Sequence, residues 1–175
     1  RGYATDIDAA RVRLIDETVE RLGLHNIQTA VLDATLGLTQ SRKFRRILVD
    51  APCSGLGVMR RHPDLRWNRR EDDVPNMARR QKALLSAAAP HLCCGGTLVY
   101  STCTLTLAEN EGVWETFLAG HPELRPFDPL SFAGEFRPLF FDAPPVGAGC
   151  RYILPGFSGT DGFFVACARK EERDV

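Results

Sequence analysis

The sequence predicts an α/β fold whose centre is a doubly wound, mostly parallel β-sheet. Apolar runs typical of strands alternate with amphipathic segments typical of helices, and the last two apolar runs are predicted to pair antiparallel. Such alternation is characteristic of doubly wound sheets, which bind their ligands beyond the carboxyl ends of the strands. Because 44% of the 175 residues are hydrophobic, we predict a single domain over residues 1–175.

The first part of the chain supplies three predicted strands and one helix. The strands are residues 3–7, "IQTAVLDAT" and "RRILVDAP", and each ends close to an aspartate. Asp8 is a favourable N-cap for the helix that follows the first strand, and Gly23 ends that helix. The apolar face of this helix consists of Val12, Ile15, Val19 and Leu22.

The second part continues the alternation after a long loop. Residues 53–70 are rich in Gly, Pro and Arg, and loops of this length in compact domains are usually functional or disordered. A helix over 74–92, the apolar strand "GGTLVYSTCTL" and a helix over 108–118 are predicted next. Residues 121–149 are predicted to be irregular, and "CRYILPG" and "DGFFVACAR" to form a C-terminal antiparallel hairpin.

Composition limits the classes of function. Lys+Arg and Asp+Glu both number 22, so no global field draws the chain to nucleic acid or membrane, and any polyanion site must be a local patch. Six cysteines without a C-x-x-C pair argue against a zinc site and a disulfide scaffold, and favour a reducing cytoplasm. No apolar run is long enough to span a bilayer. The chain begins within a predicted strand and without methionine, which suggests a cut from a longer protein.

Four polar residues are predicted to meet at the carboxyl edge of the sheet. Asp6, Asp33, Asp50 and Cys103 each stand at or just after the end of a predicted strand. A carboxylate in the position of Asp6 holds the ribose hydroxyls in many nucleotide-binding folds, and Asp33 is placed to meet the base of the same ligand. The alternative is that Asp8 caps the helix and Asp6 is a solvated residue at a strand end.

Two of the six cysteines stand apart from the others. Cys53 and Cys103 each follow a buried strand and are flanked by hydroxyl or glycine residues, so neighbouring strands would bring the two thiols face to face. A papain-type hydrolase needs a histidine base, yet none of the four histidines has an obvious relation to either cysteine. A disulfide oxidoreductase favours C-x-x-C. What remains is a thiolate that adds to an activated ring, with an acid to stabilise the developing charge.

The loop "RRHPDLRWNRR" is a candidate surface for single-stranded nucleic acid. Guanidinium groups bind phosphates and an indole face stacks on an unpaired base. The alternative is a charged, solvated loop. The candidate RNA-binding residues are Arg60, Arg61, His62, Arg66, Trp67, Arg69 and Arg70.

Three segments carry a resemblance to a known family. "DAPCSGLGVMRRHPDLRWNR", "GGTLVYSTCTLTLAENE" and "DGFFVA" resemble the signature segments of the Sun/Fmu (nucleolar protein and Sun) family of S-adenosylmethionine-dependent RNA cytosine-5 methyltransferases. The likeness runs over nearly the whole chain, and the pairing of Pro-Cys-Ser-Gly with a later Ser-Thr-Cys is highly specific. It implies a Rossmann-like methyltransferase sheet with S-adenosylmethionine as cofactor and S-adenosylhomocysteine as product.

The resemblance also implies a role for each candidate residue. Cys103 would add to carbon 6 of the target cytosine, Asp50 would contact ring nitrogen 3 and approach the methyl donor, and Cys53 would help release the product. Asp6 would hold the ribose of S-adenosylmethionine, and Asp33 would lie by its adenine. The implied substrate is RNA, ribosomal RNA of the small subunit before transfer RNA, and no metal is implied.

The chain departs from the family at its beginning. Family members carry an upstream glycine-rich segment and a central strand between those that end at Asp6 and Asp50. We therefore expect a gap in the sheet unless another chain fills it, weak binding of S-adenosylmethionine and poor turnover. One alternative is a non-catalytic RNA-binding module with an incomplete cofactor pocket. A DNA cytosine methyltransferase is disfavoured, because there the Pro-Cys itself carries the nucleophile.

Overall fold

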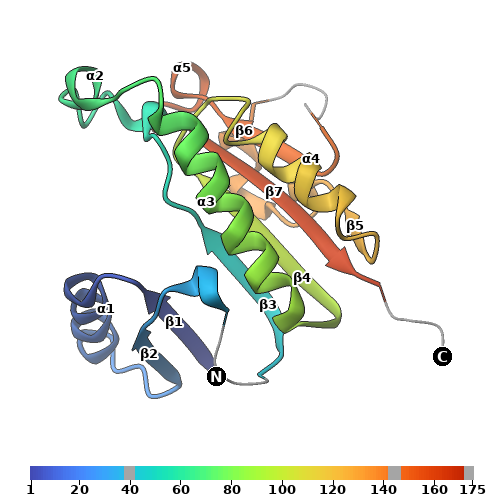
Figure 1. Ribbon diagram of the computed structural model, residues 1–175. Helices are drawn as coiled ribbons and strands as arrows, with labels where there is room; N and C mark the ends of the chain where they lie inside the picture. Colours follow the sequence, from blue (N-terminus) through green and yellow to red (C-terminus); the bar gives the residue numbers. More distant parts are fainter. Residues whose placement is uncertain (38–41, 142–146, 172–175) are drawn as a thin grey trace.

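The computed structural model describes residues 1–37, 42–141 and 147–171 and has an α/β fold (Figure 1). Strands form two separate sheets, a parallel pair and a five-stranded mixed sheet. Helices α3 (Asp73–Ala88) and α4 (Glu111–Ala119) lie side by side over one face of the larger sheet. No helix in the described ranges is long and apolar enough to cross a membrane.

The smaller sheet is a β-α-β unit. Strands β1 (Gly2–Asp6) and β2 (Ile27–Val31) pair in parallel, and α1 (Ala9–Arg21) connects them. Asp8 caps α1 as expected, because its carboxylate accepts a hydrogen bond from the Ala10 amide at 2.8 Å. All three predicted elements of this part of the chain are confirmed.

The larger sheet contains the remaining strands in the order β3-β4-β7-β5, with β6 also paired to β7. Strands β3 (Phe44–Asp50) and β4 (Leu92–Thr102) are parallel, and β7 (Phe163–Lys170) runs antiparallel to β4. β6 (Cys150–Ile153) and β7 form the predicted C-terminal antiparallel pair. The prediction of an α/β fold with a C-terminal antiparallel pair is confirmed, but the larger sheet is mixed, because β7 pairs antiparallel with each of its neighbours.

Some boundaries differ from the prediction. The helix predicted over 74–92 is α3 followed by η3 (Ala89–His91), since Pro90 leads the chain out of the α-helix and β4 begins at Leu92. The segment expected to be irregular contains the short strand β5 (Leu124–Pro126), which pairs with the end of β7. The remaining short helices are η1 (Ala34–Leu36), η2 (Leu56–Val58), α2 (Leu65–Asn68), η4 (Pro129–Ser131), η5 (Gly134–Leu139) and α5 (Pro155–Ser158).

No backbone pairing joins the two sheets in the described part of the chain, as the expected gap between β1 and β3 requires. Side chains at the opposite end of the strands from the candidate site bridge the gap. The rings of Tyr3 and Phe44 stack with their centroids 6.3 Å apart, and Arg42 donates a hydrogen bond to Gln28 at 3.0 Å. The two units therefore touch through side chains.

The hydrophobic core lies between the larger sheet and its helices. Trp114 of α4 is fully buried and stacks on Tyr100 of β4, with ring centroids 6.2 Å apart, and Phe164 of β7 meets Tyr100 edge on. The Trp114 indole donates to the Ala148 carbonyl at 2.8 Å, so its polar atom is also satisfied. The core thus fixes β4, β7 and α4 relative to one another.

Candidate active site

The parallel pairing of β3 and β4 brings two predicted site residues to one edge of the sheet. Asp50 is the last residue of β3 and lies opposite Ser101, whose hydroxyl donates to the Asp50 carboxylate at 2.8 Å. Cys103 follows β4 directly. Asp50 is exposed, so its second carboxylate oxygen is available to a ligand at this edge.

The two thiols singled out from the sequence meet at this edge. The Sγ atoms of Cys53 and Cys103 are 3.3 Å apart, and both side chains are half-buried. The hydrogen bond from Cys53 lowers the pKa of Cys103 to about 7, whereas the same contact and burial raise the pKa of Cys53. Of the two thiols, Cys103 therefore has the lower pKa and ionises first.

Tight backbone contacts fix the turn that follows Cys53. The Gly57 amide donates to the Cys103 carbonyl at 2.9 Å, and the Gly162 amide donates to the Gly57 carbonyl at 2.8 Å. A Cβ on Gly57 would lie 2.3 Å from the Gly162 carbonyl oxygen, closer than any side chain tolerates. Glycine is therefore required here to bring three segments, distant in the sequence, into contact.

Sequence reasoning missed a buried carboxylate behind the two cysteines. Glu109 has no exposed surface and accepts hydrogen bonds from the Ser54 amide at 2.8 Å and the Ser54 hydroxyl at 2.5 Å. In the sequence, Glu109 stands in "TLTLAENE", directly after the strand that ends near Cys103. That position was the feature that could have identified it. Its neighbours Thr104 and Asn110 are also fully buried, so a polar network lies under the site.

The two acids predicted to hold a cofactor lie at the ends of the smaller sheet. Asp6 ends β1, and its Oδ1 accepts from the Asp8 amide at 2.8 Å, while its Oδ2 is 3.7 Å from Arg11 Nη1. Asp33 caps η1 and accepts from the Thr35 hydroxyl at 2.6 Å, a contact that lowers the pKa of Asp33. Both carboxyl groups lie at or just beyond the carboxyl ends of parallel strands, where their oxygens can accept hydrogen bonds from the hydroxyls and amine of an adenosyl group.

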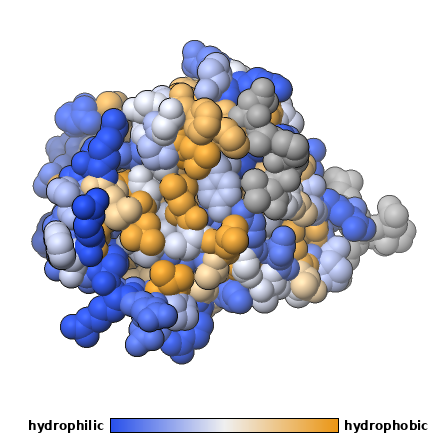
Figure 2. All heavy atoms as spheres, turned by 90° about the horizontal axis from the view of Figure 1, so that it is seen from above, coloured by the Kyte–Doolittle hydropathy of each residue, from blue (hydrophilic) through white to orange (hydrophobic). Residues whose placement is uncertain are grey.

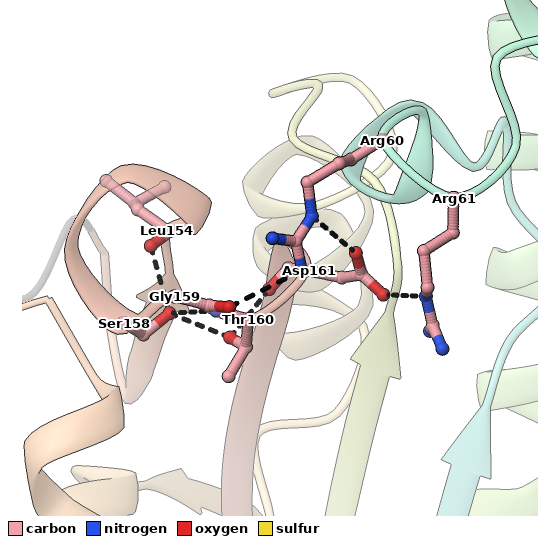
Figure 3. A network of polar contacts seen from close by, with 7 residues as sticks. All are labelled: Arg60, Arg61, Leu154, Ser158, Gly159, Thr160 and Asp161. Carbon is pink, nitrogen blue, oxygen red and sulfur yellow. Dashed lines mark hydrogen bonds and ion pairs between the residues drawn. The ribbon is translucent and has the colours of Figure 1, made fainter.

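The predicted RNA-binding residues divide into two groups. In the first, side chains contact the protein itself. The Arg69 guanidinium donates to the Ser54 carbonyl at 2.5 Å, and Figure 3 shows Arg60 and Arg61 turned toward the buried carboxylate of Asp161. Arg61 forms an ion pair with Asp161, and Arg60 Nε lies 3.9 Å from it. These contacts tie the loop to the segment just before β7.

In the second group, the side chains project into solvent. Trp67 of α2 is 84% exposed, and His62, Arg66 and Arg70 are exposed beside it. Figure 2 shows the end of the molecule that carries α2 and α5, where apolar side chains gather in the middle and hydrophilic ones at the margin. This end offers stacking surface and cationic groups together. Whether these residues bind RNA stays a prediction.

Among the described residues, no three His, Cys, Asp or Glu side chains are grouped so as to hold a metal ion. The candidate site comprises the thiols of Cys53 and Cys103, the carboxyl groups of Asp6, Asp33 and Asp50, and the arginine-rich loop. A known protein family matches nearly the whole chain. Residues 2–169 match the family model described as 16S rRNA methyltransferase RsmB/F. The chain belongs to this family.

The names of similar proteins agree with membership of the RsmB/F family. The chain is 42% identical over 177 residues to a protein of Bacillus subtilis named probable ribosomal RNA small subunit methyltransferase B. It is 41% identical over 172 residues to the protein of that name in Synechocystis. These alignments cover 98% and 96% of the chain but only 38% and 37% of the relatives. The chain thus spans about two fifths of their length.

A solved structure shares both the fold and part of the sequence. The crystal structure of NSun6 from Pyrococcus horikoshii with SFG superposes with a TM-score of 0.80 at 33% identity, covering 97% of this chain and 41% of that one. SFG is an analogue of S-adenosylmethionine. The RsmB/F family is thus one of S-adenosylmethionine-dependent methyltransferases with a Rossmann-like sheet, as the sequence resemblance implied.

Proposed function

We propose that this chain is the catalytic part of an RNA cytosine-5 methyltransferase whose substrate is ribosomal RNA of the small subunit. The observation that carries the proposal is the 3.3 Å contact between the Cys53 and Cys103 thiols beside Asp50. The RsmB/F family membership supports the substrate class. In this proposal, Cys103 is the nucleophile, Cys53 is its protonated partner and Asp50 is the acid, all at one edge of the sheet.

Cys103 is suited to the first step. Carbon 5 of cytosine is a poor nucleophile until a thiolate adds to carbon 6, which turns the ring into an enamine. The pKa of Cys103, lowered to about 7, keeps a large thiolate fraction at neutral pH. Asp50 is proposed to contact ring nitrogen 3 and stabilise the adduct; its position at the end of β3, where its carboxylate accepts a hydrogen bond from Ser101, supports this role.

Cys53 is suited to the last step. After methyl transfer, a base such as water takes the proton from carbon 5, the electron pair of that bond forms the C5=C6 double bond, and the Cys103 sulfur leaves carbon 6 as a thiolate, which restores the aromatic ring. Cys53 carries a proton at neutral pH and lies against the departing sulfur, so it protonates or hydrogen-bonds the leaving thiolate. The two cysteines thus divide attack and release between them.

The acids of the smaller sheet are proposed to hold the cofactor. S-adenosylmethionine, when bound, supplies the electrophilic methyl group. Asp6 is proposed to accept hydrogen bonds from its ribose hydroxyls, because Asp6 Oδ2 receives no hydrogen bond from any described residue. Asp33 is proposed to lie by the adenine. Asp50 lies between these acids and Cys103 in the order of the strands, which fits its second proposed task near the methyl group.

RNA recognition is assigned to the loop between Cys53 and α3. The target base must leave its stack to reach Cys103, so an unpaired or flipped nucleotide is required. Trp67 presents an open indole face, and Arg66 and Arg70 present guanidinium groups in solvent. Arg69 links this loop to the cysteine segment through the Ser54 carbonyl. RNA binding and the position of Cys53 are thereby coupled.

An adduct-trapping experiment tests the proposal. The full-length protein, as wild type, Cys53→Ala and Cys103→Ala, is incubated with S-adenosylmethionine and an unmodified transcript of small-subunit ribosomal RNA. Protein–RNA adducts that resist denaturation are then separated on a gel. We expect Cys53→Ala to accumulate the adduct and Cys103→Ala to form none.

Other outcomes would change the assignment. The reverse pattern would exchange the roles of the two cysteines. Absence of adduct and of methyl transfer in every protein would favour the alternative, an RNA-binding module without turnover. Modification of a transfer RNA transcript, and not of the ribosomal one, would keep the chemistry and replace the substrate.

A further inference from the structure

We infer that Glu109 is a positioning residue that holds the segments carrying Cys53 and Cys103 in register with each other. The inference rests on the proposed function, because the register matters for attack and release. Glu109 is completely buried in the loop between β4 and α4; among the described contacts it makes no hydrogen bond to either thiol, although it opposes electrostatically the lowering of the Cys103 pKa by the hydrogen bond from Cys53. Its task is to fix the backbone and side chains on both sides of them.

The contacts of Glu109 fix the Cys53 side first. Ser54, the next residue, donates both its amide and its hydroxyl to the Glu109 carboxylate, at 2.8 Å and 2.5 Å. Gln81 of α3 donates to the same carboxylate at 3.1 Å and to the Pro52 carbonyl at 2.8 Å. The residues before and after Cys53 are therefore both bound to one buried group, which leaves the Cys53 backbone little freedom.

The same carboxylate reaches the Cys103 side. The Thr106 hydroxyl donates to Glu109 Oε2 at 2.9 Å, and the Thr104 hydroxyl is 2.8 Å from the Ser54 hydroxyl. Tyr100 of β4 donates to the Glu109 carbonyl at 2.6 Å, which anchors the loop to the strand that precedes Cys103. One side chain thus links the two segments whose thiols lie 3.3 Å apart.

The donors around the Glu109 carboxyl group are all neutral. A buried carboxylate is unfavourable unless hydrogen bonds replace its hydration. All four donors that reach its two oxygens are neutral, from Ser54, Gln81 and Thr106, and no basic side chain bonds to it among the described residues. Oε1 accepts from two N–H groups and Oε2 from two hydroxyls, so an amide could fit only if both hydroxyls turned from donating to accepting, which would change the contacts that hold Ser54 and Thr106.

The matched pair of variants is Glu109→Gln and Glu111→Gln. Each variant replaces the carboxyl group of a buried glutamate in the same segment with an amide. Glu111 Oε2 accepts a hydrogen bond from the Tyr152 hydroxyl, and within the described part of the chain Glu111 makes no hydrogen bond to either cysteine segment, so Glu111→Gln controls for the general effect of replacing a buried carboxyl group by an amide. Circular dichroism and urea unfolding establish that each variant is folded.

The first readout measures thiol geometry without RNA. Diamide takes up the two thiol hydrogens, becomes the corresponding hydrazine, and leaves a disulfide between neighbouring cysteines. The rate of the Cys53–Cys103 disulfide is followed by peptide mass. We expect Glu109→Gln to slow it about tenfold or more and Glu111→Gln to match wild type, because small displacements of reacting groups have large effects on rate.

The second readout measures catalysis. With the ribosomal RNA transcript, kcat of Glu109→Gln should fall about 100-fold while KM for RNA changes little. The adduct should accumulate, since release depends on Cys53. If Glu109→Gln does not fold, Thr106→Val can be used instead, because it removes only one hydrogen bond to Glu109. It should lower the rate of disulfide formation and kcat, each by a smaller factor than Glu109→Gln.

Two results separate this inference from the proposed function. An unchanged disulfide rate in Glu109→Gln, or an equal loss in Glu111→Gln, overturns the positioning role, whatever the methylation result. A slower disulfide in Glu109→Gln alone, in a protein whose wild type neither forms an adduct nor methylates RNA, supports the positioning role and overturns the cytosine-5 proposal.

Discussion

The strand ends of the two sheets are held in different ways. At the ends of β3 and β4, the candidate thiols rest on Ser54 and Glu109, which are at most 1% exposed and bond across 55 positions of sequence. At the ends of β1 and β2, Asp6 and Asp33 bond to residues two positions further along and are half-exposed. Long-range contacts thus define the thiol geometry, whereas local turns define the position of the acids.

The largest expected effect comes from the core behind the thiols. Trp114→Ala should lower the free energy of unfolding by about 3–5 kcal/mol, because it leaves a cavity where a fully buried indole stacks on Tyr100. Urea unfolding followed by circular dichroism measures the loss. Val12→Ala, in the smaller unit, should cost less. Equal losses at the two positions would contradict the difference between the two regions.

A smaller effect is expected at the turn beside Cys103. Gly57→Ala places a Cβ 2.3 Å from the Gly162 carbonyl oxygen and 2.8 Å from that of Cys103, so the backbone must move. Overpacking of this kind costs about 1–3 kcal/mol, and the shift should also slow methyl transfer. Gly156→Ala is a suitable control, because nothing lies within 4 Å of its added carbon. Wild-type stability in Gly57→Ala would contradict the close approach.

The third prediction concerns pH. The pKa of Cys103 is about 7, lowered by the hydrogen bond from Cys53, so the thiolate and the rate of adduct formation should increase through pH 7 and then level off. Below that value the rate should fall about tenfold per pH unit. Cys53→Ala removes the hydrogen bond and should move the plateau to higher pH, although its adduct persists. A pH-rate profile of adduct formation that is the same in both proteins would contradict this contact.

The smallest effect is expected in the β1–β2 unit. Asp8→Ala removes the N-cap of α1 and should cost about 1 kcal/mol, a local loss that leaves the Cys53–Cys103 geometry unchanged. Urea unfolding measures the first quantity, and the rate of diamide oxidation measures the second. A slower disulfide in this variant would show that the two regions are not independent.

Local patterns were enough to predict the elements and the position of the two thiols. The period of apolar residues and the Asp8 cap predicted α1, and the strand-end positions of Cys53 and Cys103 predicted that they meet. Boundaries were less accurate where a single residue decides them, as at Pro90 after α3. β5 was missed because three residues with a proline carry no alternation.

Contacts between distant segments could not be predicted. Glu109 and Ser54 are 55 positions apart, and only the packing of α3, β4 and the loop after β4 brings them together. The pairing of Arg60 and Arg61 with Asp161 has the same origin, so a loop predicted to be free for phosphate is partly bound to the protein. The sequence shows that these residues are charged or lie in a motif, but their hydrogen-bond and ion-pair partners depend on how distant segments pack together.

The chain has two tryptophans, and their surroundings are opposite. Trp114 is enclosed in the core and stacked on an aromatic ring, whereas Trp67 projects into solvent from α2. Indole emission moves to longer wavelength in water, so these two side chains are expected to emit at different wavelengths. Quenching by iodide would select Trp67 and report contacts at the arginine-rich loop, while the blue-shifted emission of Trp114 would report the integrity of the larger sheet.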